Sequence, residues 1–190
     1  MEAIKKIEIS KISKIILISF LGTLLLTLSA KVKIPLGPVP QTMQTFVVLF
    51  LGVAFGARVA LLTVSFYLLQ GIFGLPVFSG TPEKGIGLIY FTGPTMGYLI
   101  GFLIAAYVAG TFRYKDIFKG NISGFFSNYF KLLFAVSFIY IFGMCWLGNV
   151  IGWDKPIFKF GAEPFLLPEI FKILILTLLA GKINKLRKII

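Results

Sequence analysis

Glu169 and Lys172 are the residues whose types and spacing most clearly indicate chemistry in this sequence. They lie three positions apart in the apolar segment 164–181, so on a helix they share one face. An acid or a lysine at mid-bilayer costs about 2.5–3.5 kcal/mol, and residues kept there at that cost mark functional sites. One alternative is that the pair only neutralises itself, with Lys172 extending toward the membrane surface. However, the helix dipole disfavours a cation near a helix N-terminus, which favours an anionic or strongly accepting partner for Lys172 that is not always part of the protein.

Other residues in apolar segments could contribute to the same site. Tyr98 offers a hydroxyl and an aromatic face, and Trp146 is a candidate for a pocket wall or for packed core. The amide of Gln44 can donate and accept at once, although a glutamine near the membrane surface can also simply be hydrated. Gly97 belongs to a stripe of small residues that is typical of close helix packing, and it could also admit a ring system near the backbone. The stripe consists of Gly93, Gly97, Gly101, Ala105 and Ala109.

The residue inventory excludes several kinds of chemistry. There is no histidine, and Cys145 is the only cysteine, so disulfides, Cys/His zinc sites and haem ligation by histidine are ruled out. Cys145 lies in an apolar run, where we expect a small buried side chain. We therefore expect no metal site, no cofactor and no catalytic residues.

Composition indicates a membrane protein. The 190 residues are 57% hydrophobic and 14% charged, with a mean hydropathy of +0.93, whereas a soluble domain carries roughly 25% charged residues. The formal net charge of +12 does not indicate nucleic-acid binding, because the Lys and Arg residues cluster in short segments between apolar runs.

Six apolar segments approach the length of a membrane span, which is about 20 residues for a helix. They predict an all-α membrane protein, a bundle of six transmembrane helices that forms a single domain over residues 1–190. The second and third segments are separated only by Arg58 and predict a tight helical hairpin, with one long re-entrant segment as the alternative. The predicted spans are 12–30, 42–57, 59–73, 94–112, 129–151 and 164–181.

The distribution of basic residues predicts the orientation, because cytoplasmic loops are enriched in Lys and Arg. Of the 19 Lys and Arg residues, thirteen fall on the side that holds both termini and five on the other, while Lys172 lies within the last span. Both termini are therefore predicted to be cytoplasmic. The connection 71–93, on the far side, is long and apolar, so we expect it to fold back onto the bundle as a lid over a cavity.

Three segments in order carry a family resemblance: 74–78 (GLPVF), 93–102 (GPTMGYLIGF), and Pro164-Phe165 followed by an acid and a lysine three apart. They resemble the biotin-specific substrate-binding (S) component of energy-coupling-factor (ECF) transporters, the BioY family. The likeness runs from about Ile34 to Lys172. It differs where the family has Gly-Asp before the lysine, because this chain has Pro168-Glu169 there.

The resemblance implies a vitamin site at the outer ends of the last three helices, capped by the first, third and fifth connections. Glu169 would accept from a ureido N–H of biotin, and Lys172 would donate either to the ureido oxygen or to the tail carboxylate. Both are expected near one end of the ligand. Phe78, Tyr98 and Trp146 would surround the ring, and Ser79 is a further polar candidate.

The resemblance also implies partners and a location. The expected partners are a transmembrane scaffold protein and a pair of cytoplasmic ATPases, in a bacterial plasma membrane, because the chain has no phosphate-binding loop for ATP. The scaffold would dock on the first helix through the stripe Ser19, Gly22 and Thr23. A homo-oligomer is left open. The alternative functions are an S component or solitary transporter for another small vitamin, and an intramembrane enzyme that uses Glu169 as a general base.

Overall fold

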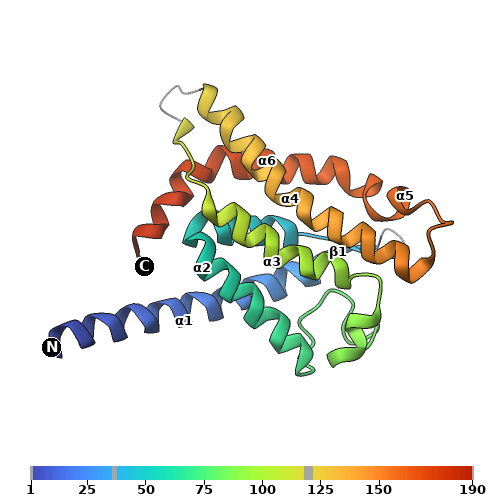
Figure 1. Ribbon diagram of the computed structural model, residues 1–190, viewed down its shortest axis with the longest axis horizontal. Coiled ribbons are helices and arrows are strands. Elements are labelled where there is room, and N and C mark those ends of the chain that lie inside the picture. The colour runs from blue at the N-terminus through green and yellow to red at the C-terminus, as the bar shows by residue number, and fades with distance from the viewer. Residues whose placement is uncertain (1, 36–37, 118–121, 190) are drawn as a thin grey trace.

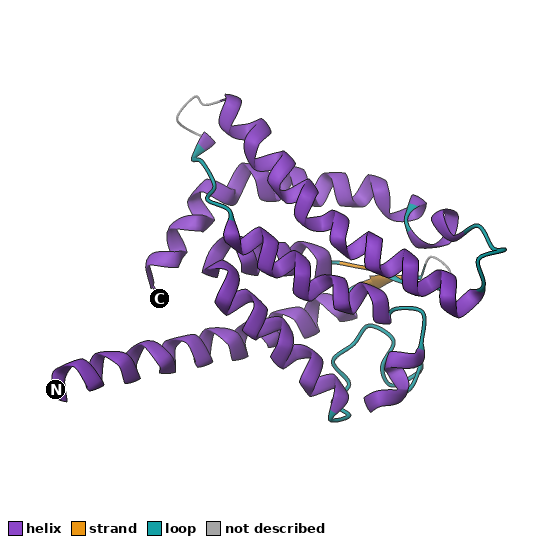
Figure 2. Cartoon of the chain, viewed as in Figure 1, coloured by secondary structure: helices purple, strands orange, loops and turns teal. Residues whose placement is uncertain are grey.

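The computed structural model describes residues 2–35, 38–117 and 122–189 and shows a bundle of helices (Figure 1). Most of the chain is helical (Figure 2), as the sequence predicts. The elements in chain order are α1 (Glu2–Lys31), β1 (Lys33–Ile34), β2 (Gln41–Thr42), α2 (Gln44–Ile72), η1 (Gly87–Thr92), α3 (Met96–Thr111), α4 (Ile122–Ile151), α5 (Ile157–Gly161), α6 (Glu163–Ile183) and η3 (Asn184–Ile189).

The bundle has two different ends (Figure 1). Both termini, the bend of α2 and the last residues of α3 lie at one end. The β1–β2 pair, η1 and α5 lie at the other. The strands pair antiparallel, with Lys33 opposite Thr42 and Ile34 opposite Gln41. We refer to the end with both termini as the terminal end of the bundle and to the end with the β1–β2 pair as the β end.

α2 takes the place of the second and third predicted spans, and it is not a continuous helix. Gly56 inside it has φ 79° and ψ 171°, outside the helical region, and the two halves run in different directions (Figure 1). A left-handed φ is open to glycine because it lacks a Cβ. The chain thus breaks at Gly56, two residues before Arg58, where the sequence places the division.

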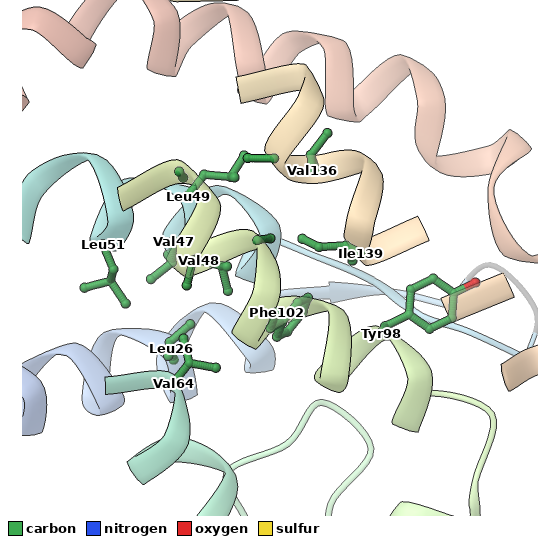
Figure 3. Close-up of a cluster of buried hydrophobic side chains, with 14 of the residues drawn as sticks. Leu26, Val47, Val48, Leu49, Leu51, Val64, Tyr98, Phe102, Val136 and Ile139 are labelled. Carbon is green, nitrogen blue, oxygen red and sulfur yellow. The ribbon is translucent and has the colours of Figure 1, made fainter. Parts of the chain in front are cut away.

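α3 lies between α2 and α4, and its small residues allow close approach on both sides. A Cβ built on Gly101 would lie 2.6 Å from the Cα of Ile139 in α4, while one on Gly52 in α2 would lie 2.7 Å from the carbonyl oxygen of Ala106. The packing interpretation of the small-residue stripe is therefore confirmed. Figure 3 shows buried side chains from α1 to α4 converging in the core that this approach creates. They include Leu26, Val48, Val64, Phe102 and Ile139.

The connection between α2 and α3 folds back onto the β end, as the sequence predicts. Val77, Phe78 and Tyr90 are buried, and the Phe78 ring stacks on the Tyr90 ring with centroids 4.7 Å apart. We call residues 77–83 the cap. This connection lacks the regular backbone hydrogen bonds of a helix or a strand. Burial of its aromatic rings therefore holds it in place.

α6 contains a proline within its second turn. Pro168 has no N–H, so the carbonyl of Pro164 loses its helical donor, but the helix continues to Ile183. Because α6 begins at Glu163, Glu169 and Lys172 lie about one and a half and two and a half turns inside the helix and not at its first residues. On the neighbouring α4, Cys145 is exposed, contrary to the expectation of a buried thiol.

Four helices of the described chain are long and apolar enough to cross a membrane: those within 11–31, 44–72, 122–151 and 163–189. α3 is apolar but has only 16 residues. Many of the large apolar side chains on α1, α4 and α6 are exposed, which suits lipid better than water. The structure thus supports a multi-pass membrane protein, and the count of six spans remains a prediction.

Candidate binding site

A cavity of about 60 Å³ lies at the β end, between α2, α3, α4 and α6 and beneath the cap. Ligand pockets for small molecules are typically about 300–1,000 Å³. A ligand of vitamin size therefore requires a wall of the cavity to move. Two connections without regular secondary structure contribute to the lining: the segment before β2, with Val39 and Pro40, and the cap, with Phe78 and Ser79. The cap is the longer of the two and covers the cavity with a buried ring.

Glu169 projects into this region from α6 and is only 4% exposed. Its Oε2 atom accepts three hydrogen bonds, from Thr45 Oγ1 at 3.0 Å, Tyr140 OH at 3.0 Å and Lys172 Nζ at 3.2 Å. Its Oε1 atom is buried, and no group in the described residues donates to it. An unpaired buried acceptor costs about 1–3 kcal/mol. The carboxylate therefore has one oxygen fixed by the protein and the other in need of a donor.

Lys172 is 7% exposed and bonds inward, which excludes the alternative that it extends to the membrane surface. Nζ donates to the Thr42 carbonyl oxygen at 2.9 Å, to Thr45 Oγ1 at 2.9 Å and to Glu169 Oε2 at 3.2 Å. An ammonium has three donors, so all are used. The acceptors of Lys172 thus lie within the protein, on β2, the start of α2 and α6, whereas the sequence interpretation favoured a partner from outside it.

Four of the predicted site residues line the cavity together with Glu169 and Lys172: Gln44, Phe78, Ser79 and Tyr98. The Gln44 amide already donates to Tyr67 OH at 2.8 Å, and the Tyr98 hydroxyl donates to the Gly161 carbonyl at 2.8 Å. Tyr98 therefore offers its aromatic face to the cavity, since its hydroxyl hydrogen is committed to α5.

Two predicted site residues, Trp146 and Gly97, are not among the residues that line the cavity. The indole N–H of Trp146 donates to the Gly93 carbonyl at 2.9 Å and so joins α4 to the turn before α3. A Cβ on Gly97 would collide with the Phe142 carbonyl and the Trp146 side chain. Both residues belong to the contact between α3 and α4. Gly97 allows the two helices to pack closely, and Trp146 donates to the backbone of the turn that precedes α3.

Sequence reasoning missed Thr45 and Tyr140 as members of the site. Thr45 directly follows Gln44 and both accepts from Lys172 and donates to Glu169. Tyr140 lies on α4, where a hydroxyl within the apolar part of the helix is the available signal, one that Ser137 shares. Its ring also lies near Tyr98 and Phe165, with centroid separations of 6.4 Å and 6.3 Å. These two hydroxyls orient the carboxylate toward the cavity lining.

The cap is tied to the bundle by side chains and not by a sheet or helix. Lys31 Nζ donates to the carbonyl oxygens of Phe78 at 2.9 Å and Thr81 at 3.0 Å, and Lys33 Nζ donates to that of Ser79 at 2.9 Å. Tyr67 OH donates to the Val77 carbonyl at 3.0 Å. These donors satisfy backbone carbonyl groups of the cap, and the Phe78 carbonyl accepts in addition from the Thr81 N–H and hydroxyl.

The stripe predicted to dock a scaffold faces the interior of the chain. Ser19 and Thr23 are at most 1% exposed, and a Cβ on Gly22 would lie 2.5 Å from the Thr63 side chain of α2. Thr23 also accepts a hydrogen bond from the Gln70 amide at 3.2 Å. The structure thus corrects this assignment, because small and hydroxyl-bearing residues on α1 are used for packing against α2.

The arrangement can bind a neutral or weakly polar molecule that offers N–H donors. Among the described residues that line the cavity, Glu169 is the only carboxylate, and its partner charge is supplied by Lys172. A ligand donor that reached Oε1 would be bound by a charge-assisted hydrogen bond, about twice as strong as a neutral one. The aromatic rings of Phe78, Tyr90 and Tyr98 contribute to the apolar part of the lining, together with aliphatic and aromatic side chains of α3, α4 and α6.

Comparison with known proteins identifies the same family over nearly the whole chain. The profile of the BioY family matches residues 3–189. The probable biotin transporter BioY of Pyrococcus horikoshii is 32% identical over 160 residues, which cover 84% of this chain and 90% of that protein. The biotin transporter BioY of Thermotoga maritima is 32% identical over 164 residues, covering 86% and 92%.

The fold is also found in a solved structure. A crystal structure of the S-component for biotin from an ECF-type ABC transporter superposes with a TM-score of 0.74 and covers 93% of each chain. The two sequences are 23% identical, so this likeness shows the fold.

Proposed function

This chain belongs to the BioY family, and on that premise we propose that it takes up biotin as the substrate-binding component of an energy-coupling-factor transporter. The family assignment makes it a transporter component and not an enzyme. The reading of Glu169 as the general base of an intramembrane enzyme is therefore not carried further.

The observation that carries the proposal is the unpaired Oε1 atom of Glu169 in the cavity lining. Biotin carries a ureido group with two N–H donors, and one of them would supply the missing hydrogen bond. The three donors of Lys172 are already used within the protein, so Lys172 would act chiefly by fixing Oε2. In this proposal Glu169 is the ureido acceptor and Lys172 positions it. This role for Lys172 differs from both alternatives that the resemblance implied, in which Lys172 donates to the ligand.

Phe78, Tyr98 and Tyr90 would then enclose the apolar part of the ligand, with Gln44 and Ser79 as polar neighbours. The small volume of the cavity supports a closed, ligand-free conformation that opens through the cap. Biotin would enter from the β end, which is extracytoplasmic in the predicted orientation.

We further propose six spans with both termini in the cytoplasm of a bacterial plasma membrane. In this arrangement the two halves of α2, divided at Gly56, count as separate short spans and α3 as another. A Cys145→Ser background with one added cysteine, Lys159→Cys or Lys188→Cys, tests the orientation. A membrane-impermeant maleimide should label position 159 in intact cells and leave position 188 unlabelled; the reverse pattern would overturn the orientation.

The partners proposed are a transmembrane scaffold and two cytoplasmic ATPases, since the chain has no phosphate-binding loop of its own. Biotin uptake measured with and without these partners separates an ATPase-dependent component from a solitary transporter. Light scattering of the detergent-solubilised protein measures whether it forms a homo-oligomer.

The direct test is mass spectrometry of small molecules that co-purify with the protein, followed by titration with biotin. Co-purification of biotin and saturable binding support the proposal. Binding of a different vitamin would keep the transporter role and change the substrate. Failure of biotin to bind a folded protein would overturn the substrate assignment.

A further inference from the structure

A second hollow lies at the terminal end of the bundle, far from the biotin cavity. It has a volume of about 380 Å³ and is lined by residues at the end of α3, in the connection that follows and in η3. Four of the six lining residues are cationic, and no acid is among them in the described chain. The lining consists of Thr111, Arg113, Asn184, Lys185, Arg187 and Lys188.

Arg187 is held in place by the break in α2. Its Nε donates to the Val53 carbonyl at 3.0 Å and its Nη2 to the Gly52 carbonyl at 2.9 Å. These carbonyls belong to the last turn before Gly56, where a helix end leaves acceptors unsatisfied. A guanidinium has five N–H groups, so this anchor leaves others to bond elsewhere. A fixed arginine is a pre-organised binding group for a phosphate.

The positive charge of the hollow is only partly balanced. Lys185 pairs with Asp116 Oδ2 at 3.0 Å. Within the described residues, the side chains of Arg113 and Lys188 make no ion pair or hydrogen bond, and Arg187 bonds only to backbone carbonyls. Asn184 adds a buried Oδ1 atom that has no donor in the described structure. A ligand that fits this hollow would carry both negative charge and a hydroxyl donor.

The hollow lies at the depth where the apolar surface ends. Leu178 and Leu179 are exposed on the last turns of α6, and the chain then passes directly into the basic η3. Phospholipid headgroups lie at this boundary, and basic pockets between transmembrane helices recognise their phosphates.

We propose that the hollow is a binding site for the phosphate of an anionic phospholipid headgroup. Arg113, Arg187 and Lys188 would hold the phosphate by charge-assisted hydrogen bonds, and Asn184 Oδ1 would accept from a headgroup hydroxyl. This site would anchor the terminal end of the bundle to the membrane independently of biotin.

Native mass spectrometry of the detergent-purified protein with added phosphatidylglycerol tests this proposal, with phosphatidylcholine as the uncharged comparison. The Arg113→Gln/Lys188→Gln double variant removes two unpaired cations and leaves Arg187 to support α2. The matched control, Lys155→Gln/Lys159→Gln, removes the same charge at the β end. We expect at least tenfold tighter binding of phosphatidylglycerol than of phosphatidylcholine, lost in the double variant and retained in the control.

Equal binding of the two lipids, or an equal loss in the control variant, would overturn the proposal. Competition by inorganic phosphate would support phosphate as the recognised group. Binding of inorganic phosphate in the absence of any lipid preference would instead assign the hollow to free phosphate and overturn the lipid source. The thermal unfolding midpoint of the double variant, compared with that of the control variant, establishes that both are folded.

Discussion

Lys172 Nζ lies 3.2 Å from Glu169 Oε2, and both side chains are at most 8% exposed. This buried ion pair uses one oxygen of the carboxylate and leaves Oε1 without a partner among the described residues. Removing one member of a buried pair is strongly destabilising, because it leaves an uncompensated charge in a low-dielectric environment. Each residue is therefore expected to contribute to ligand affinity, and the stability of the site is expected to depend on the presence of both.

We predict that Glu169→Gln and Lys172→Ala each lower biotin affinity at least tenfold, which corresponds to about 1.4 kcal/mol. The first weakens the charge-assisted bond from the ligand, and the second releases the carboxylate from its fixed orientation. Calorimetric titration of the purified variants measures the effect. Glu163→Gln is the matched control, since this acid lies on the same helix, is exposed and does not line the cavity. Wild-type affinity in either site variant would remove the site assignment.

Stability should show that the two residues depend on each other. Lys172→Met alone leaves the Glu169 carboxylate buried without its cation, and we expect a loss of about 3–5 kcal/mol. Adding Glu169→Gln should restore part of that loss, because the double variant has no buried charge at the site. Thermal unfolding in detergent gives the order of the midpoints. A double variant less stable than Lys172→Met would contradict this account of the pair.

Tyr140→Phe should lower biotin affinity although Tyr140 was not identified from the sequence. Its hydroxyl donates to Glu169 Oε2 at 3.0 Å, and a hydrogen bond to a charged group contributes about 1.5–3 kcal/mol. Because the effect on the ligand is indirect, we expect a smaller loss of affinity, about threefold to tenfold, which corresponds to about 0.7–1.4 kcal/mol. Tyr129→Phe on the same helix serves as the control. If the two variants titrate alike, Tyr140 does not position the carboxylate.

Lys31→Met should speed the release of biotin. The Lys31 ammonium holds two carbonyls of the cap, so its loss frees the segment that supplies Phe78 and Ser79 to the cavity. Lys31 is exposed, and solvent screening reduces the effect of each bond; we expect a rise in the release rate of about threefold or more. The rate is measured from preloaded protein by exchange with labelled biotin. Lys155→Met, an exposed lysine at the same end, should release biotin at the wild-type rate. An unchanged rate in Lys31→Met would show that cap and ligand are uncoupled.

Much of the site was predictable because its central pair breaks a local rule. Glu169 and Lys172 are charged residues at helical spacing in an apolar segment, and they can be recognised from the sequence of that segment alone. The cap was predictable for a similar reason, since a long apolar connection has to bury its rings. In contrast, the depth of Trp146 in its helix left a pocket wall and packed core as equal alternatives. Its indole N–H donates to the Gly93 carbonyl in the connection before α3, a partner that helical periodicity does not reveal.

The scaffold-docking stripe illustrates the same limit. Ser19, Gly22 and Thr23 are small and repeat at helical spacing, which indicates a close contact without saying with what. The structure assigns that contact to α2, where Thr63 fills the space over Gly22. Helical spacing predicts that one face of the helix packs against a partner, and only the fold determines which element that partner is.

The sequence by itself determined the membrane class, the helical architecture and the acid–lysine pair, because hydropathy and helical periodicity are properties of neighbouring residues. The tertiary structure alone decided how that pair is used. Thr42 and Thr45, which fix Lys172, lie 130 and 127 positions away along the chain, and Tyr140, which fixes Glu169, lies on a different helix. Hydrogen-bond satisfaction in a buried site depends on such distant partners. It is therefore the fold that leaves Glu169 Oε1 unpaired and available to a ligand.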